Sequence, residues 1–288
     1  MDHIKKILVP IDFTNISKKI VKYAISFGSK FNVSPQVLHV STKPPDVYYR
    51  FFPDITGYLS AIEENTQNKL NEFVEDISPD LKGVLRYGTV YQEVIQYVQD
   101  ESIDLIIISA RGHTYSTRQP LGTISRKIIR KAECPVLTVY GKRETAHIRK
   151  ILCPLDLSEQ SYQGLHQAVC LARKFNAKIY LLHVIELHEF DKQGIKKYSS
   201  EEAFETLTDA FQKEIKIPPE YNDVKIEKII RRNIDAAAEI VYFASEQNID
   251  LITLTTHGRS YWPRVLLGSV TEKVAHIAPC PVFTVRIK

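Results

Sequence analysis

An internal duplication is the strongest constraint on how this chain can fold. Residues 6–12 (KILVPID) return 144 positions later as residues 150–156 (KILCPLD). Further matches follow at shifts of 144 or 146 residues: 30–32 with 174–176, 38–40 with 182–184, 103–106 with 249–252, and 134–136 with 280–282. A repeat this long is a whole domain, because solenoid units span only about 20–50 residues. The 288 residues are therefore expected to form two copies of one domain, residues 1–141 and 147–288.

Each copy alternates predicted strands with predicted helices. In the first copy, short apolar runs typical of buried parallel strands recur between segments with helical apolar spacing. The predicted strands are residues 7–11, 36–40, 84–87, 105–109 and 136–140. The predicted helices lie at about residues 16–27, 60–75, 90–99 and 124–131. Repeated strand–helix units imply right-handed crossovers, so each copy is predicted to be an open, doubly wound, five-stranded parallel α/β domain with helices on both faces.

Composition excludes several other classes of protein. Hydrophobic residues make up 44% of the chain and charged residues 25%, which is ordinary for a globular protein. The net charge of +4 is too small to indicate a nucleic-acid partner. No run approaches the roughly 18 apolar residues of a membrane helix, and the N-terminus lacks a signal-peptide pattern. We therefore expect a cytoplasmic protein without a membrane partner, and four cysteines with no Cys-x-x-Cys pair fit a reducing compartment.

A glycine motif follows the fourth predicted strand of each copy, where open α/β sheets bind their ligands. It consists of a glycine, nine residues, a second glycine and a hydroxyl residue that opens a helix. Its members are Gly112, Gly122 and Thr123 in the first copy, and Gly258, Gly268 and Ser269 in the second. Glycine lets a ligand approach the backbone, and a helix start offers N–H groups and a positive dipole end to a phosphate. Alternatively, the glycines serve only the turn, and Thr123 and Ser269 cap their helices.

These motifs resemble those of the universal stress protein family, and the resemblance covers almost all of both copies. It implies a tandem two-domain member with a Rossmann-like fold of the adenine-nucleotide alpha-hydrolase-like kind. Nucleotide-binding members of that family carry Gly-x2-Gly-x9-Gly-Ser/Thr here, so the resemblance implies ATP or AMP as the cofactor, with Mg²⁺ as a companion ion. It also implies that the two domains pair through their last strands, residues 136–140 and 282–287, and it is compatible with a homodimer.

The resemblance assigns site residues one by one. Asp12 and Asp156, after the first strand of each copy, match the family's adenine-facing aspartate, and Val40 and Val184 match its adenine-contacting valine. The residues implied for the second copy are Asp156, Val184, Thr255, His257, Gly258, Arg259, Gly268, Ser269 and Val270. Those implied for the first copy are Asp12, Val40, Ser109, Gly112, Gly122 and Thr123. For the aspartates the alternative is helix capping, assisted by Thr14 or Ser158; for His257 and Arg259 it is an ordinary solvated loop.

Both copies depart from the family motif at its first glycine, which is Ser109 in the first copy and Thr255 in the second. A side chain at that position is expected to narrow the nucleotide site. The first copy also has Pro120 in the phosphate loop, where the second has Leu266. We therefore expect nucleotide binding in the second copy before the first.

The resulting functional hypothesis is a stress-response regulatory protein with adenine-nucleotide sites at the carboxyl ends of its strands. No residue is placed as a general base or nucleophile, so any ATP hydrolysis would be slow. A Walker loop and a dinucleotide Gly-x-Gly-x-x-Gly are both missing from the sequence. The alternatives are a nucleotide-free interaction scaffold and a slow ATP hydrolase. His39 and His183 are expected to be structural or surface residues, and Cys134 and Cys280 to be packed thiols.

Overall fold

The computed structural model describes residues 4–42, 55–110, 121–140, 143–186, 201–256 and 267–286. They separate into two compact units, with the division between Ala146 and His147. We refer to these units as domain 1 and domain 2. Within the described residues, no helix combines the length and the apolar composition that crossing a membrane requires.

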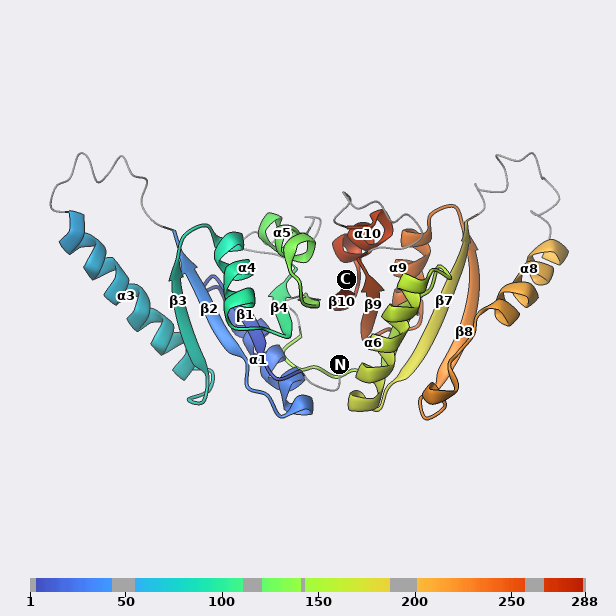
Figure 1. The fold of residues 1–288 in the computed structure, drawn as a ribbon, viewed down its shortest axis with the longest axis horizontal. Coiled ribbons are helices and arrows are strands. Elements are labelled where there is room, and N and C mark those ends of the chain that lie inside the picture. The colour runs from blue at the N-terminus through green and yellow to red at the C-terminus, as the bar shows by residue number, and fades with distance from the viewer. Residues whose placement is uncertain are drawn as a thin grey trace. The chain divides into compact units, whose positions relative to one another are not determined.

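Domain 1 is built on five parallel strands. They are β1 (Ile7–Ile11), β2 (Gln36–Ser41), β3 (Lys82–Tyr87), β4 (Leu105–Ser109) and β5 (Val136–Val139). Their order in the sheet is β3-β2-β1-β4-β5 (Figure 1). Chain order reverses between β1 and β4, and this reversal is the topological switch point at which such sheets bind ligands.

Domain 2 repeats this arrangement. Its strands are β6 (Lys150–Pro154), β7 (Lys178–Glu186), β8 (Ile226–Asn233), β9 (Leu251–Thr255) and β10 (Val282–Val285). They are parallel in the order β8-β7-β6-β9-β10, with the switch point between β6 and β9. The prediction of two tandem, five-stranded parallel α/β domains is confirmed.

Helices connect the strands in both domains. Domain 1 has α1 (Asn15–Gly28), α3 (Ile55–Glu75), α4 (Val90–Asp100) and α5 (Thr123–Lys131), with a short 3₁₀ turn, η1 (Ser29–Phe31). Domain 2 has α6 (Glu159–Phe175), α8 (Glu201–Glu214), α9 (Ala236–Glu246) and α10 (Ser269–Ile277), with η3 (Pro219–Tyr221). Figure 1 shows α3 beside β3 in domain 1 and α8 beside β8 in domain 2. In each domain, the two helices that follow the third and fourth strands contact one another.

One helix boundary was predicted wrongly. Helix α3 begins at Ile55, about five residues before the predicted start. The apolar spacing continues upstream through Leu59 and Ile55, but Gly57 interrupts it. Glycine has the lowest helix propensity after proline, so this segment reads as a break in the sequence although the helix runs through it.

The middle strands of each sheet form the core. Ile7, Leu8 and Val9 of β1 are fully buried, as are Leu105 and Ile106 of β4. The matching residues Ile151, Leu152, Leu251 and Ile252 of β6 and β9 are also fully buried. Continuous burial along a strand requires cover on both faces, which explains the unbroken apolar runs in the sequence.

An aspartate clamps the first and fourth strands together at the amino edge of each sheet. In domain 1, Asp104 Oδ2 accepts hydrogen bonds from the N–H groups of Lys5 (2.8 Å) and Lys6 (2.9 Å). In domain 2, Asp250 Oδ2 accepts from the N–H groups of residues 149–150 at 2.9 and 3.1 Å. The duplicated Ile-Asp-Leu-Ile motif therefore has a structural role, because its aspartate aligns the two strands that flank the switch point.

Removing this clamp is expected to destabilise domain 1. Asp104→Ala deletes a charged acceptor for two N–H groups, so the free energy of unfolding should fall by about 1–3 kcal/mol. Asp80→Ala makes the same charge change at an exposed position and should leave stability nearly unchanged. Urea unfolding followed by circular dichroism measures both; an equal loss in the two variants would contradict the clamp.

Candidate functional site

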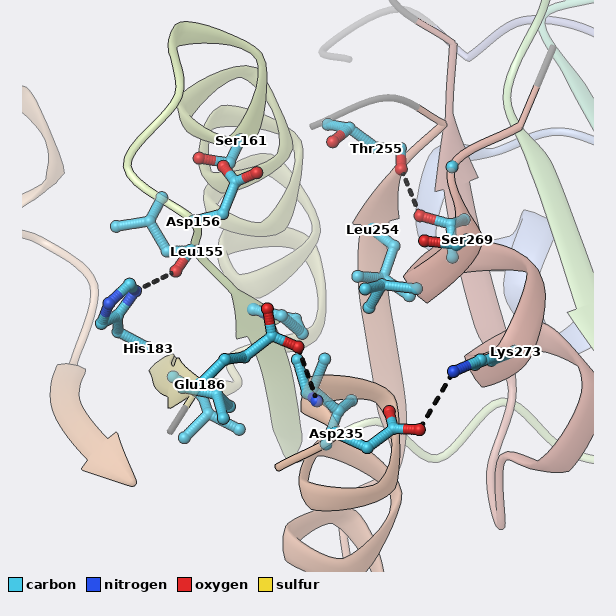
Figure 2. A pocket seen from close by; sticks show the side chains of 18 of the residues that line it. Leu155, Asp156, Ser161, His183, Glu186, Asp235, Leu254, Thr255, Ser269 and Lys273 are labelled. Carbon is cyan, nitrogen blue, oxygen red and sulfur yellow. Dashed lines mark hydrogen bonds and ion pairs between the residues drawn. The ribbon is translucent and has the colours of Figure 1, made fainter. Parts of the chain in front are cut away.

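A cavity of about 500 Å³ opens at the switch point of domain 2. It exists because β6 pairs with β9 at Ile151 and Leu152, whereas β6 remains paired with β7 as far as Pro154. Beyond that shared segment a crevice opens at the carboxyl ends of the strands. The volume lies within the range of small-molecule sites, about 300–1,000 Å³. Figure 2 shows Asp156 and Ser269 on opposite sides of the cavity.

Six of the residues predicted for domain 2 line this cavity. They are Asp156, Val184, Thr255, Gly268, Ser269 and Val270. His257, Gly258 and Arg259 lie outside the described residues. In domain 1, the predicted residues occupy the matching carboxyl edge, at the ends of β1, β2 and β4 and at the start of α5. They are Asp12, Val40, Ser109, Gly122 and Thr123, while Gly112 lies outside the described residues.

The carboxylate of Asp156 is held by a strained turn after β6. Its Oδ1 accepts hydrogen bonds from the N–H (3.0 Å) and the hydroxyl (2.5 Å) of Ser158. Ser158 is the residue that caps α6, accepting from Ser161 N at 3.2 Å. Leu157, between them, has a left-handed φ of 65°, which is rare for a bulky side chain. Asp156 is thus not itself the cap of α6. Its hydrogen bonds with Ser158 hold the cap residue in position and orient the carboxylate at the cavity.

Domain 1 has the same turn at the matching position. Phe13 has a left-handed φ of 59°. Asp12 Oδ1 accepts from the hydroxyls of Thr14 (2.6 Å) and Ser17 (2.7 Å), and Thr14 caps α1. Strained backbone is often concentrated at functional sites. The strain was missed in the sequence, and its only signal there is the repeated Asp-x-Ser/Thr after the first strand.

A histidine supports this turn in each domain. His183 Nδ1 lies 2.7 Å from the carbonyl oxygen of Leu155, and its ring packs on Phe211 with 4.4 Å between centroids. His39 Nδ1 lies 3.1 Å from the carbonyl oxygen of Ile11. Burial lowers the pKa of His39 below its usual value of 6.5, so its neutral form is favoured. These contacts give both histidines the structural role expected for them.

Metal and thiol chemistry find no support in the described part of the chain. No three His, Cys, Asp or Glu side chains gather there in a group that could hold a metal ion. Burial raises the pKa of Cys134 to about 12, so the unreactive thiol form prevails at neutral pH. Cys280 is buried. Cys280 thus fits the expectation of a packed thiol, whereas Cys134 is partly exposed.

Thr255, which replaces the first glycine of the motif, does not fill the cavity. Its methyl group packs towards α6, where Gly164 leaves room: a Cβ at residue 164 would lie 3.1 Å from Thr255 Cγ2. Domain 1 has the reverse pair at the matching positions, the large Ile20 and the small Ser109. In domain 1 the larger side chain of the pair is on the helix, and in domain 2 it is on the strand. Thr255 forms part of the cavity wall.

Glycine occupies the N-cap position of α10. Gly268 has no side chain to accept a hydrogen bond, and its own N–H donates to Thr256 O at 2.6 Å. Ser269 is the first residue inside the helix, so the alternative that it caps α10 is wrong. Gly122 and Thr123 are placed in the same way at the start of α5. The first N–H groups of a helix lack acceptors within it, and those of α10 belong to residues that line the cavity.

The start of α9, on the same cavity, is instead occupied by the protein's own carboxylates. Asp235 caps this helix, with Oδ1 accepting from the N–H groups of Ala237 (2.9 Å) and Ala238 (3.3 Å). Glu186 Oε1 accepts from Ala236 N at 3.3 Å. Sequence reasoning missed both acidic residues. An aspartate directly before a run of alanines is a recognisable N-cap signal for Asp235, but Glu186 had none.

Comparison with known proteins identifies the chain. The sequence profile of the universal stress protein family matches residues 3–140 and again residues 147–286. The chain belongs to the universal stress protein family. The predicted tandem, two-domain architecture of this universal stress protein is confirmed by the double match and by relatives of the same length.

Relatives of this universal stress protein match either about half of the chain or nearly all of it. A universal stress protein of Methanocaldococcus jannaschii is 34% identical over 141 residues, covering 48% of this chain and 82% of that protein. One of Mycolicibacterium smegmatis is 25% identical over 291 residues, covering 97% of this chain and 96% of that protein. The crystal structure of a universal stress protein from Archaeoglobus fulgidus matches the fold with a TM-score of 0.69 at 20% identity, covering 98% of both chains.

The packing of Thr255 against Gly164 predicts an unusual response to alanine. Gly164→Ala should lower the free energy of unfolding by about 1–2 kcal/mol, because the overpacking of Thr255 by the new methyl group outweighs the gain in helix propensity of about 0.5–1 kcal/mol. Adding Thr255→Ser should recover much of that loss. Gly57→Ala in α3, where a Cβ meets nothing within 4 Å, should instead stabilise by about 0.5–1 kcal/mol. Chemical denaturation tests all three; stabilisation by Gly164→Ala would refute the packing.

The cap on α9 predicts a pH dependence. Hydrogen bonds from Lys273 and from the N–H groups of Ala237 and Ala238 lower the pKa of Asp235. The stability that Asp235 contributes is therefore present above its unfolded pKa of about 3.9 and is lost as pH falls through the lower folded value. Asp235→Asn should flatten the fall in Tm between pH 5 and 3, whereas Asp209→Asn, on the exposed face of α8, should not. Parallel curves for Asp235→Asn and the unmodified protein would contradict this assignment.

Proposed function

We propose that this universal stress protein is a stress-response regulatory protein that binds an adenine nucleotide, AMP or ATP, in the domain 2 cavity. The observation that carries the proposal is the arrangement of the two cavity walls. One wall presents a held carboxylate, Asp156, and the other presents the glycine-capped start of α10 (Figure 2). This pairing suits a ligand with a hydrogen-bond donor at one end and an anion at the other.

The phosphate end is assigned to α10. Three helix starts line the cavity, those of α6, α9 and α10. In α6, Ser161 N already donates to the cap residue Ser158. The first N–H groups of α9 already donate to Asp235 and Glu186. The start of α10 has a glycine in the cap position, and its first residues, Ser269 and Val270, line the cavity. Main-chain N–H groups and the positive end of the helix dipole favour an anion at such a position. A phosphate is thus best accommodated at α10.

The base end is assigned to the opposite wall. Asp156 would accept a hydrogen bond from the exocyclic amino group of adenine. Val184, Leu182, Leu254 and Ile240 line the cavity and offer apolar surface to the ring. Guanine presents a carbonyl oxygen where adenine presents the amino group, so the carboxylate would repel it. This contrast supports adenine over guanine.

Regulation suits the cavity better than catalysis. Asp156, Glu186 and Asp235, the carboxylates among its described lining residues, each already accept main-chain or hydroxyl hydrogen bonds. They are therefore engaged in holding structure rather than placed as a general base. In this proposal Mg²⁺ arrives with the phosphates of ATP, and a cytoplasmic site of action follows the family expectation.

Titration calorimetry with the full-length protein tests the proposal. AMP and ATP should bind, and GMP should bind at least tenfold more weakly. Asp156→Asn should weaken AMP binding about tenfold, the effect expected for one charge-assisted hydrogen bond of about 1.4 kcal/mol. Asp12→Asn in the matching turn of domain 1 is the control and should leave the domain 2 site unchanged.

Each other result has a defined meaning. Loss of AMP binding in Asp12→Asn with retention in Asp156→Asn would move the site to domain 1. Strong binding unaffected by either variant would exclude both aspartates as adenine ligands. If calorimetry detects neither AMP nor ATP at millimolar concentration, the interaction-scaffold alternative replaces the proposal.

A further inference from the structure

We propose that Lys273 is a second phosphate ligand of the domain 2 cavity, which exchanges Asp235 for the nucleotide phosphate when the nucleotide binds. This inference rests on the proposed function, because it names a residue that would recognise the anionic end of the same ligand. It rests on five observations: the position of Lys273 on α10, the nature of its ion pair, the charge of the cavity, the groove beside Lys273, and a comparison with domain 1.

The position of Lys273 places its side chain beside the phosphate end. It follows Ser269 by four residues on α10, so the two side chains lie on the same face of the helix. Side chains on a helix lean towards its N-terminus, which brings the ammonium group towards the glycine-capped start. Lys273 and Ser269 both line the cavity. Figure 2 shows both side chains, with the lysine directed to Asp235.

The ion pair between Lys273 and Asp235 can be exchanged at little cost. Lys273 Nζ lies 3.0 Å from Asp235 Oδ2, and the two side chains are 59% and 41% exposed. Exposed pairs of this kind contribute only about 0–1 kcal/mol. The other oxygen of Asp235, Oδ1, makes the hydrogen bonds that cap α9. Releasing the lysine therefore leaves the cap in place.

The charge of the cavity calls for a cation. Its described lining residues include three carboxylates, those of Asp156, Glu186 and Asp235. Among the same residues, Lys273 carries the one permanent positive charge. A phosphate entering beside these carboxylates is repelled by them, and among the described lining residues Lys273 is the group best placed to offset that repulsion.

Lys273 also has space in which to move. Together with Asp235 and Ser269, it lines a neighbouring groove of about 480 Å³ between α9 and α10. The ion pair between Lys273 and Asp235 thus borders both the cavity and this groove. The small side chain of Ala237 also lines the groove. In domain 1 the residue matching Ala237 is Tyr91. The centroid of its ring lies 4.6 Å from the Nζ of Lys127, the lysine that matches Lys273.

The internal repeat points to the same residue. A lysine is present in both copies, as Lys127 and Lys273, although the neighbouring side chains have diverged strongly. The changed neighbours on the same helix are Arg126 against Glu272, Arg130 against His276, and Lys131 against Ile277. Lys127 faces an aromatic ring and Lys273 faces a carboxylate, so the shared feature is the cation beside the glycine-capped helix rather than its partner.

A comparison of AMP with adenosine tests the proposal, because adenosine lacks the phosphate. In the full-length protein, Lys273→Gln should weaken AMP binding about tenfold and change adenosine binding less than twofold. Lys273→Arg should retain most of the AMP affinity. Lys174→Gln, in the last turn of α6 at the opposite edge of the sheet, makes the same charge change and should alter neither ligand.

A double-mutant cycle tests the exchange itself. Asp235→Asn keeps a good cap residue but frees Lys273, so AMP affinity should rise about two- to fivefold. That gain should be clearly smaller when Lys273→Gln is also present, because only the loss of repulsion between Asp235 and the phosphate then remains. The cycle needs AMP alone, so it decides the question even where adenosine binds too weakly to measure.

The results separate this inference from the function on which it rests. Equal weakening of AMP and adenosine by Lys273→Gln, or no weakening of either, would overturn the role of Lys273. A gain from Asp235→Asn that is equally large with and without Lys273→Gln would overturn the exchange. Failure of the unmodified protein to bind both ligands would instead overturn the proposed function.

Discussion

The site depends on the short pairing between the two parallel strands at the switch point, β6 and β9, which separate towards their carboxyl ends. In domain 2, β6 and β9 pair only over Ile151 and Leu152. Beyond these residues β6 is paired with β7, and β9 with β10. Fully buried apolar side chains hold the amino halves of these strands together, and the Asp250 clamp aligns them at the amino edge. The carboxyl halves are left to diverge, and the crevice is the direct result. The described residues assigned to the ligand line this crevice.

The two domains share their supporting structure and differ at this rim. The aspartate clamps and the histidines behind the first turn occur in both. At the rim, Thr42 stands in domain 1 where domain 2 has Glu186, and Thr89 stands where it has Asp235. The two copies thus differ at positions that line the domain 2 cavity, while the strand pairing that creates the crevice has been kept.

The sequence predicted the strands well because buried parallel strands leave unbroken apolar runs, and the repeat confirmed each run independently. It also located part of the cavity wall, since the glycine motif and Asp156 follow the strands directly. Other features depend on segments that are distant in the chain. The accommodation of Thr255 depends on Gly164, some ninety positions earlier, and neither residue reveals the other in the sequence.

The acidic rim was missed for a related reason. Glu186 lies on β7 and binds the start of α9, fifty residues later, so its role emerges only when the two elements are side by side. Lys273 was also missed, because nothing in the sequence distinguishes it from other charged residues on a helix. Its significance depends on Asp235, which reaches it from a different helix.

The left-handed backbone of Leu157 and Phe13 has an evolutionary consequence. Valine, isoleucine and threonine adopt that conformation at the highest cost, because their branched Cβ crowds the neighbouring carbonyl. Drift at these two positions is thereby restricted to unbranched residues, glycine or asparagine. The residue type directly after the aspartate therefore indicates whether this turn is present. In distant relatives, a β-branched residue there would indicate that the left-handed turn has been lost, and with it the orientation of the carboxylate.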